Sequence, residues 1–229
     1  MLDIEVDKLQ KLKTDILNLN HFALDVNEQI LSGLEKCETC NLQIIKVPSK
    51  HDVQEKISAI DTEIVKLLAF FGMEAKDLRL MVAYLKITNE FERIFTRSRS
   101  FIRDFPTKIA EVDKDFVLEY VIPLQRSALV ALDYDITLQL EDEKPTIEKI
   151  IKSVIAEENN NDDLYKRAEQ SILKKMDNQV YLTKEYQDIL LCLRRVEKIA
   201  DRALSIAFML HYAKIGGNME HFDRINFSS

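Results

Sequence analysis

Glycine and proline are scarce in this chain of 229 residues, which contains only four of each. Average proteins contain roughly 7% glycine and 5% proline, and all-β folds use these residues in the tight turns between their short strands. So few turn residues exclude a β-sandwich or a β-barrel. The chain is also 46% hydrophobic, which is enough apolar material for a sizeable core. The sequence therefore predicts an all-α fold built from long helices.

Only a few segments interrupt the helical pattern of apolar residues, and six helices are expected between them. Their expected ranges are roughly 3–36, 50–71, 76–104, 109–140, 145–176 and 184–214. Pro123 lies inside the fourth range and should kink or interrupt that helix, because proline has no amide hydrogen to donate. Pro145 suits the first turn of the fifth helix. The polar segment 157–163 forms either a solvated helix surface or a local break in the helix, and the surface is favoured.

The third and sixth expected helices carry matching apolar stripes. The first stripe has the three-and-four spacing of one helix face and consists of Tyr84, Ile87, Phe91, Ile94 and Phe101. A shift of 105 positions gives the second stripe, which consists of Ile189, Cys192, Val196, Ile199 and Ile206. The same shift aligns Glu92 with Glu197 and Ser100 with Ser205. Although any two amphipathic helices can be aligned, the shared polar residues favour a duplication. We expect two pseudo-symmetric three-helix bundles, residues 1–105 and 106–229.

Charge and hydropathy exclude several classes of protein. The 32 basic and 39 acidic residues give a net charge of -7, so no overall cationic field is available to hold nucleic acid. No apolar run approaches the roughly 18 residues of a membrane span, and the acidic N-terminus does not resemble a signal peptide. Three cysteines are too few for a disulfide framework. We therefore expect a cytoplasmic protein without a membrane span.

The sequence shows no recognisable catalytic motif. Its four histidines lie far apart and form neither H-E-x-x-H nor Glu-x-x-His, and its glycines cannot form a phosphate-binding loop. We therefore expect no enzyme activity and no nucleotide. Cys37 and Cys40 form a C-x-x-C pair without the further ligands that a metal site needs. The pair is either two small residues near a helix end or half of a metal or redox site.

Two segments of the chain resemble the paired motifs of the PhoU family. The first is AKDLRL at 75–80 followed by KITNEFERI at 86–94, and the second is VEKIADRALSIA at 196–207. The resemblance implies two three-helix bundles related by a pseudo-twofold axis, the architecture that the duplication also predicts. It further implies a negative regulator of the phosphate response. Such a regulator binds a phosphate ABC transporter complex in the membrane and a sensor histidine kinase, and is expected in the cytoplasm, peripheral to the inner face of the membrane.

The resemblance also implies metal ligands, because each half of a PhoU protein carries a Glu/Asp-x-x-x-Asp pair. Glu197 and Asp201 match this pair, and residues four apart on a helix can present oxygens to one cation. Glu92 matches it in the first half, where Thr96 stands in place of the aspartate. We therefore expect divalent or ferric metal, iron or zinc, mainly in the second half, with further ligands from other helices. The alternative is a surface ion pair of Glu197 with Arg194 or Lys198.

Four arginines cluster in the third expected helix, with no acidic residue between the first and the last: Arg93, Arg97, Arg99 and Arg103. Guanidinium groups match the geometry of phosphates and carboxylates. The cluster is therefore a candidate surface for an anion or an acidic partner. The alternative is a solvated face that offsets nearby acids such as Asp104.

Two further functions remain open at this point. One is a metal-binding regulator of another transporter, such as an ion carrier or a sodium–phosphate carrier. The other is a metal-storage protein or a metal-dependent enzyme on a helical bundle. For the PhoU-like regulator a homodimer is expected, because symmetric dimers are the commonest assembly.

Overall fold

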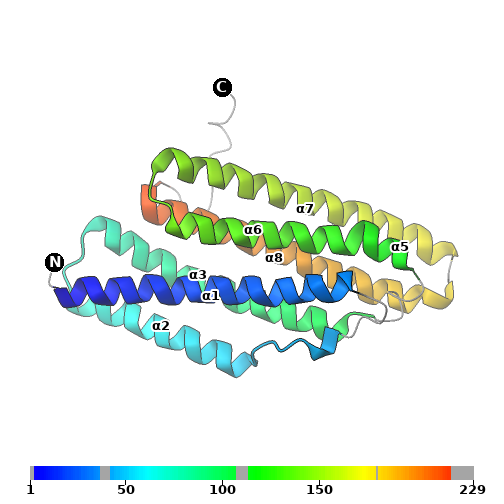
Figure 1. Ribbon diagram of the computed structural model, residues 1–229, viewed down its shortest axis with the longest axis horizontal. Helices are drawn as coiled ribbons and strands as arrows, with labels where there is room; N and C mark the ends of the chain where they lie inside the picture. Colours follow the sequence, from blue (N-terminus) through cyan, green and yellow to red (C-terminus); the bar gives the residue numbers. More distant parts are fainter. Residues whose placement is uncertain (1–2, 37–41, 107–112, 179, 218–229) are drawn as a thin grey trace.

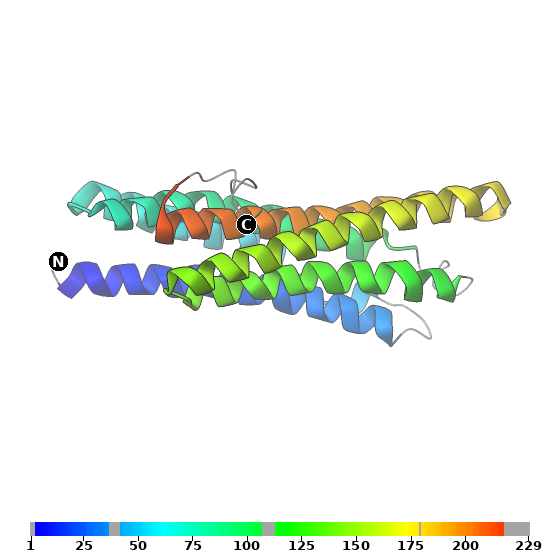
Figure 2. The ribbon, with the colours of Figure 1, turned by 90° about the horizontal axis from the view of Figure 1, so that it is seen from above.

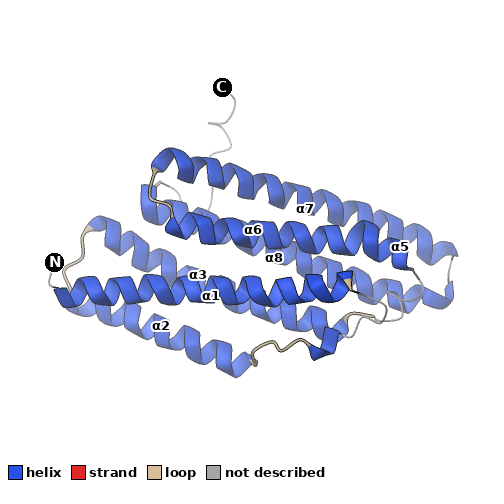
Figure 3. Ribbon diagram, in the orientation of Figure 1, coloured by secondary structure: helices blue, strands red, loops and turns tan. Residues whose placement is uncertain are grey.

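The computed structural model describes residues 3–36, 42–106, 113–178 and 180–217, and it is helical almost throughout these ranges (Figure 1). Its long helices are α1 (Asp3–Glu35), α2 (Lys50–Phe70), α3 (Ala75–Asp104), α6 (Ile122–Leu140), α7 (Lys144–Asn178) and α8 (Thr183–Ile215). Short helical segments are η1 (Leu42–Ile44), α5 (Lys114–Phe116), η2 (Val117–Val121) and η3 (Val180–Leu182). Figure 3 shows no strand in the described part of the chain. The all-α prediction is confirmed.

The long helices form two groups that follow the order of the sequence. In Figure 1, α1, α2 and α3 lie together below, and α6, α7 and α8 lie together above. The two groups meet along two helix pairs, α1 with α6 and α3 with α8, as Figure 2 shows from above. None of the described helices combines the length and the apolar character that a membrane crossing requires.

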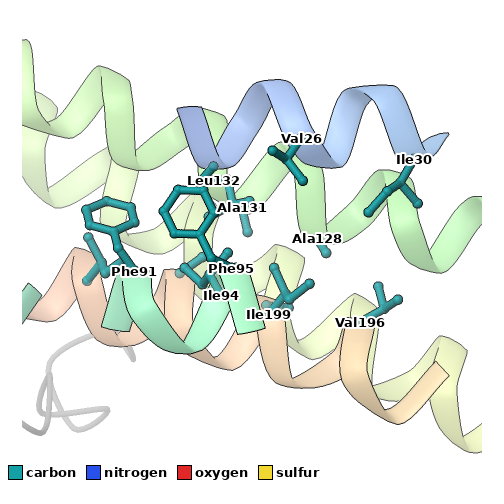
Figure 4. Close-up of a cluster of buried hydrophobic side chains, with 14 of the residues drawn as sticks. Val26, Ile30, Phe91, Ile94, Phe95, Ala128, Ala131, Leu132, Val196 and Ile199 are labelled. Atoms are coloured by element: carbon teal, nitrogen blue, oxygen red, sulfur yellow. The ribbon is translucent and has the colours of Figure 1, made fainter. Parts of the chain in front are cut away.

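Both predicted apolar stripes are buried. None of their ten side chains is more than 5% exposed, and Cys192 packs in the core as a small apolar residue would. Figure 4 shows how Val26 of α1, Phe95 of α3, Leu132 of α6 and Ile199 of α8 converge. Apolar side chains from both groups of helices therefore form one continuous core.

Ion pairs at the edge of this core link α3 to α8. Arg202 Nη1 of α8 lies 3.1 Å from Glu90 Oε2, and Arg195 Nη2 lies 2.6 Å from Asp104 Oδ2. Arg103 and then Arg195 hold the pKa of Asp104 at about 2. Glu90 is almost fully buried, so its contact with Arg202 helps to fix the register of the two helices.

The structure refines the expected irregularities. Pro123 is the second residue of α6, and a π-helical turn at Val117–Val121 precedes it, which is the interruption that the proline predicts. The polar segment 157–163 continues α7 without a break. Its Asn161 is an exception to the predicted solvated surface, because its side chain is buried and donates to the Leu124 carbonyl at 2.9 Å. Cys37, Cys40 and the expected helical residues 109–112 lie outside the described residues.

Candidate functional site

A cluster of three carboxylates lies between α7 and α8. Glu158 and Asp162 come from α7, and Asp201 comes from α8. One carboxylate oxygen from each residue lies within 4.8 Å of the other two, and all three residues are partly buried. Such a convergence of hard oxygen donors is the arrangement that hard cations require. Within the described part of the chain, this is the one group of three acidic, histidine or cysteine residues that is close enough to share an ion.

Glu197 extends this cluster by one helical turn. Its Oε2 atom is buried and has no hydrogen-bond partner among the described residues. Burial raises the pKa of Glu197, and the nearby charges of Asp201 and Asp162 raise it further. A partly buried carboxylate with a free oxygen beside Asp162 and Asp201 is chemically suited to a cation. We call Glu158, Asp162, Glu197 and Asp201 the acidic site.

Lys198 partly neutralises the acidic site. Its Nζ atom lies 2.8 Å from Glu197 Oε1 and 2.5 Å from Asp201 Oδ2. The surface pairing of Glu197 with Lys198, which the sequence allowed, is therefore present beside the carboxylate cluster. Partial burial lowers the pKa of Lys198, but the hydrogen bonds that its ammonium group donates to Asp201 and Glu197, together with their charges, outweigh burial and raise the pKa. An ion bound at Asp201 would compete with this ammonium group for the same oxygens.

The corresponding face of the first half differs in character. Glu92 accepts a hydrogen bond from Gln54 Nε2 of α2 at 2.8 Å, so its neighbour across the helices is an amide. Thr96, which aligns with Asp201, accepts a hydrogen bond from Arg99 Nη2 at 3.1 Å. Glu92 is thus surrounded by a different set of side chains from Glu197, although the two align in sequence.

The four predicted arginines line one groove together with Lys50 of α2. Arg93 Nη1 pairs with Glu90 Oε1 at 3.0 Å, and Arg103 pairs with the adjacent Asp104 at 2.6 and 2.8 Å. These contacts agree with the alternative in which the arginines offset nearby acids, but they occupy only part of the cluster. Arg97 makes no ion pair or hydrogen bond with the described residues.

Two solved structures with the same architecture are PhoU proteins. The chain matches the crystal structure of PhoU from Pseudomonas aeruginosa with a TM-score of 0.79 and 19% sequence identity, over 92% of this chain and 99% of that one. It matches the phosphate transport system regulatory protein PhoU from Streptococcus pneumoniae with a TM-score of 0.73 and 17% identity, over 93% of this chain and 98% of that one. The chain has a PhoU-like fold. No protein-family model and no curated protein matches the sequence.

Within this PhoU-like fold, the sequence identified two of the four residues of the acidic site. It assigned Glu197 and Asp201 and expected further ligands from other helices, but it did not name Glu158 and Asp162. The sequence feature that could have identified Glu158 and Asp162 is their separation by four positions in the polar segment of α7. Glu197 and Asp201 have the same separation. That signal is weak alone, because acids four apart are also common on solvated helix faces.

Proposed function

We propose that this chain is a PhoU-like regulator of phosphate uptake and of phosphate-responsive signalling. The observation that supports the proposal most strongly is the shared fold along more than nine-tenths of the chain, with relatives that include a phosphate transport system regulatory protein. The two sequence motifs lie on α3 and α8, the helices that form the main contact between the halves. The protein would act through its helix surfaces by binding other proteins, without chemistry of its own.

The proposed partners are a phosphate transporter complex in the membrane and a sensor histidine kinase, met at the cytoplasmic face of the membrane. A homodimer is part of the proposal, and light scattering coupled to size-exclusion chromatography measures it directly. The same fold would also suit a regulator of an ion carrier or a sodium–phosphate carrier. Cross-linking of the tagged chain in native membranes, followed by mass spectrometry, separates these partners, because each transporter yields its own peptides.

The phosphate response provides the functional test. Deleting the gene should raise expression from a phosphate-starvation promoter in phosphate-rich medium, since a negative regulator has been removed. The wild-type chain supplied on a plasmid should restore repression. Unchanged promoter activity and unchanged phosphate uptake in the deletion strain would refute the proposal.

We further propose that the acidic site holds a metal ion in the working protein. Glu158, Asp162 and Asp201 would supply the first oxygens, and Glu197 would turn its free oxygen toward the ion and release Lys198. An all-oxygen donor set favours a hard cation, so ferric iron fits better than zinc, whose protein sites mostly use cysteine and histidine. A bound cation would bridge α7 and α8 and stabilise the face that they form together.

Substitution of Asp201 by asparagine should weaken binding of Mn²⁺, used as a hard-cation probe, by at least tenfold, because one anionic ligand is lost. Mn²⁺ binding is measured by electron paramagnetic resonance at pH 7.5 and again at lower pH. Affinity should fall as the pH is lowered, since burial raises the pKa of Glu197 and protons then displace the metal from it.

The matched control for this experiment is Glu92→Gln, which changes the aligned residue in the other half. It should leave the affinity for Mn²⁺ unchanged, since the acidic cluster lies on α7 and α8. Equal loss of binding in Glu92→Gln and Asp201→Asn would show that both halves hold metal. Full binding by Asp201→Asn would show that the ligands are misassigned.

A further inference from the structure

The groove that contains the four arginines carries a strong local positive charge. It has a volume of about 980 Å³ and runs between the C-terminal part of α3 and the segment that leads into α2. Its described lining includes five cations, Lys50, Arg93, Arg97, Arg99 and Arg103, and a single carboxylate, Glu92. Its formal charge is therefore +4, although the whole chain carries -7. We call it the basic groove.

The arginines of the basic groove retain hydrogen-bond donors for a partner. Arg99 is held in place, because it donates to the Pro48 carbonyl at 3.0 Å and to Thr96 at 3.1 Å. Arg97 has no ion pair or hydrogen bond with the described residues and keeps all five of its N–H donors. A fixed guanidinium beside a free one is an arrangement that can receive carboxylates without first breaking strong internal contacts.

Apolar side chains form part of the same groove. Ile45 and Val47 contribute from the segment before α2, and Ile102 contributes from α3. Ile45 and Val47 are partly exposed and pack against the main core. The groove therefore combines cations with an apolar surface.

This combination decides which occupant fits. A water molecule takes roughly 30 Å³ in the liquid, so a groove of about 980 Å³ is far larger than one small inorganic anion needs. A phosphate or a polyphosphate would also leave the apolar side chains uncovered. A chain segment that carries both carboxylates and an apolar side chain satisfies both kinds of lining.

We propose that the basic groove docks an acidic segment of a partner protein. Carboxylates of the segment would bind Arg97, Arg99 and Lys50, and an apolar side chain between them would cover Ile45, Val47 and Ile102. The inference rests on the proposed function, since a regulator that works by binding proteins needs a docking surface. It also gives the two halves different tasks, with an acidic site on α7 and α8 and a basic groove on α3.

The test uses a displayed library of random 12-residue peptides selected on the purified full-length protein. Recovered peptides should be enriched in aspartate and glutamate around one or two apolar residues. The affinity of a recovered peptide, measured by fluorescence anisotropy, should fall as salt rises past about 0.15 M, where the Debye length is roughly 8 Å. Lack of acidic enrichment would overturn the proposal.

Charge reversal locates the binding surface. The variant Lys50→Glu/Arg97→Glu should bind the peptide at least tenfold more weakly and melt within a few degrees of wild type, because neither side chain has an ion pair to lose among the described residues. Lys13→Glu/Lys149→Glu makes the same change in net charge at exposed positions outside the groove and should bind normally. Equal weakening in both variants would mean that only net charge matters, which contradicts the proposal.

Two other ligands complete the test. Vesicles with one-quarter phosphatidylglycerol should not bind more tightly than the peptide, and 10 mM phosphate should compete no better than chloride at equal ionic strength. Preferred binding of vesicles or specific competition by phosphate would assign the groove to a membrane surface or to the anion and overturn the proposal. Peptide binding is measured apart from the phosphate-starvation promoter, so failure of the groove and failure of the proposed function are distinguishable.

Discussion

Replacing Phe95 with alanine should lower the free energy of unfolding of the whole chain by about 3–5 kcal/mol. Phe95 is fully buried on α3, and its ring centroid lies 5.2 Å from that of Phe22 on α1. Side chains of α6 and α8 complete the core around it (Figure 4). The substitution removes apolar contacts and leaves a cavity that helices from both halves must border. Urea denaturation followed by circular dichroism measures the loss.

The matched control is Phe70→Ala at the end of α2, where the side chain is 78% exposed. This change should cost less than about 0.5 kcal/mol, because no cavity forms. Both variants should unfold in one transition with the wild-type dependence on urea, since the halves share one core. A cost for Phe95→Ala as small as that for Phe70→Ala, or separate unfolding of the two halves, would contradict a shared core.

The fold was predictable because its main signal is local. Side chains such as Phe91 and Val196 follow the spacing of a helix face, and that spacing alone predicts which side is buried. The sequence predicted that Pro123 interrupts the helix, but it did not predict that the interruption is a π-helical turn. The geometry of that turn depends on how the chain enters α6. The burial of Asn161 depends on a carbonyl of another helix and has no signature in its own segment.

The candidate sites were predictable only within single helices. The spacing of Glu197 and Asp201 identifies one face of α8, but the acids that meet it depend on the register of α7 against α8. The arginine cluster was likewise visible on α3. Its groove was not, because Lys50 and Val47 reach it from a segment more than forty positions earlier. Register and long-range packing are properties of the whole core, and no single segment encodes them.

Substitution of Asp135 by asparagine should stabilise the protein at pH 8. Asp135 lies on α6, is fully buried, and has no hydrogen-bond partner among the described residues for either carboxylate oxygen. Burial therefore raises the pKa of Asp135 well above its ordinary value. In the unfolded chain the same group releases its proton near pH 3.9. At neutral pH the native state thus either holds a proton that the unfolded state has lost or buries an unpaired charge.

The sign of the pH dependence follows from this difference in bound protons. At Asp135 the native state binds more protons than the unfolded state. The contribution of Asp135 to the free energy of unfolding therefore falls as pH rises, by about 1.4 kcal/mol per pH unit between roughly pH 4 and the raised pKa. Asparagine has nearly the same shape and no titration. The advantage of Asp135→Asn over wild type should therefore grow with pH across that range and stay constant above the raised pKa.

Asp133→Asn is the control for this prediction, because Asp133 is exposed on the same helix two residues earlier. Urea unfolding of wild type and both variants at pH 5, 6.5 and 8 gives the required differences, in which the titration of all other groups cancels. Asp133→Asn should differ from wild type by less than about 0.5 kcal/mol at each pH. If the free energies of unfolding of Asp135→Asn and wild type differed by the same amount at every pH, the pKa of Asp135 would be the same in the unfolded and native states, and the prediction would be wrong. Destabilisation of Asp135→Asn at pH 8 would mean that the ionised carboxylate has a stabilising partner in solution.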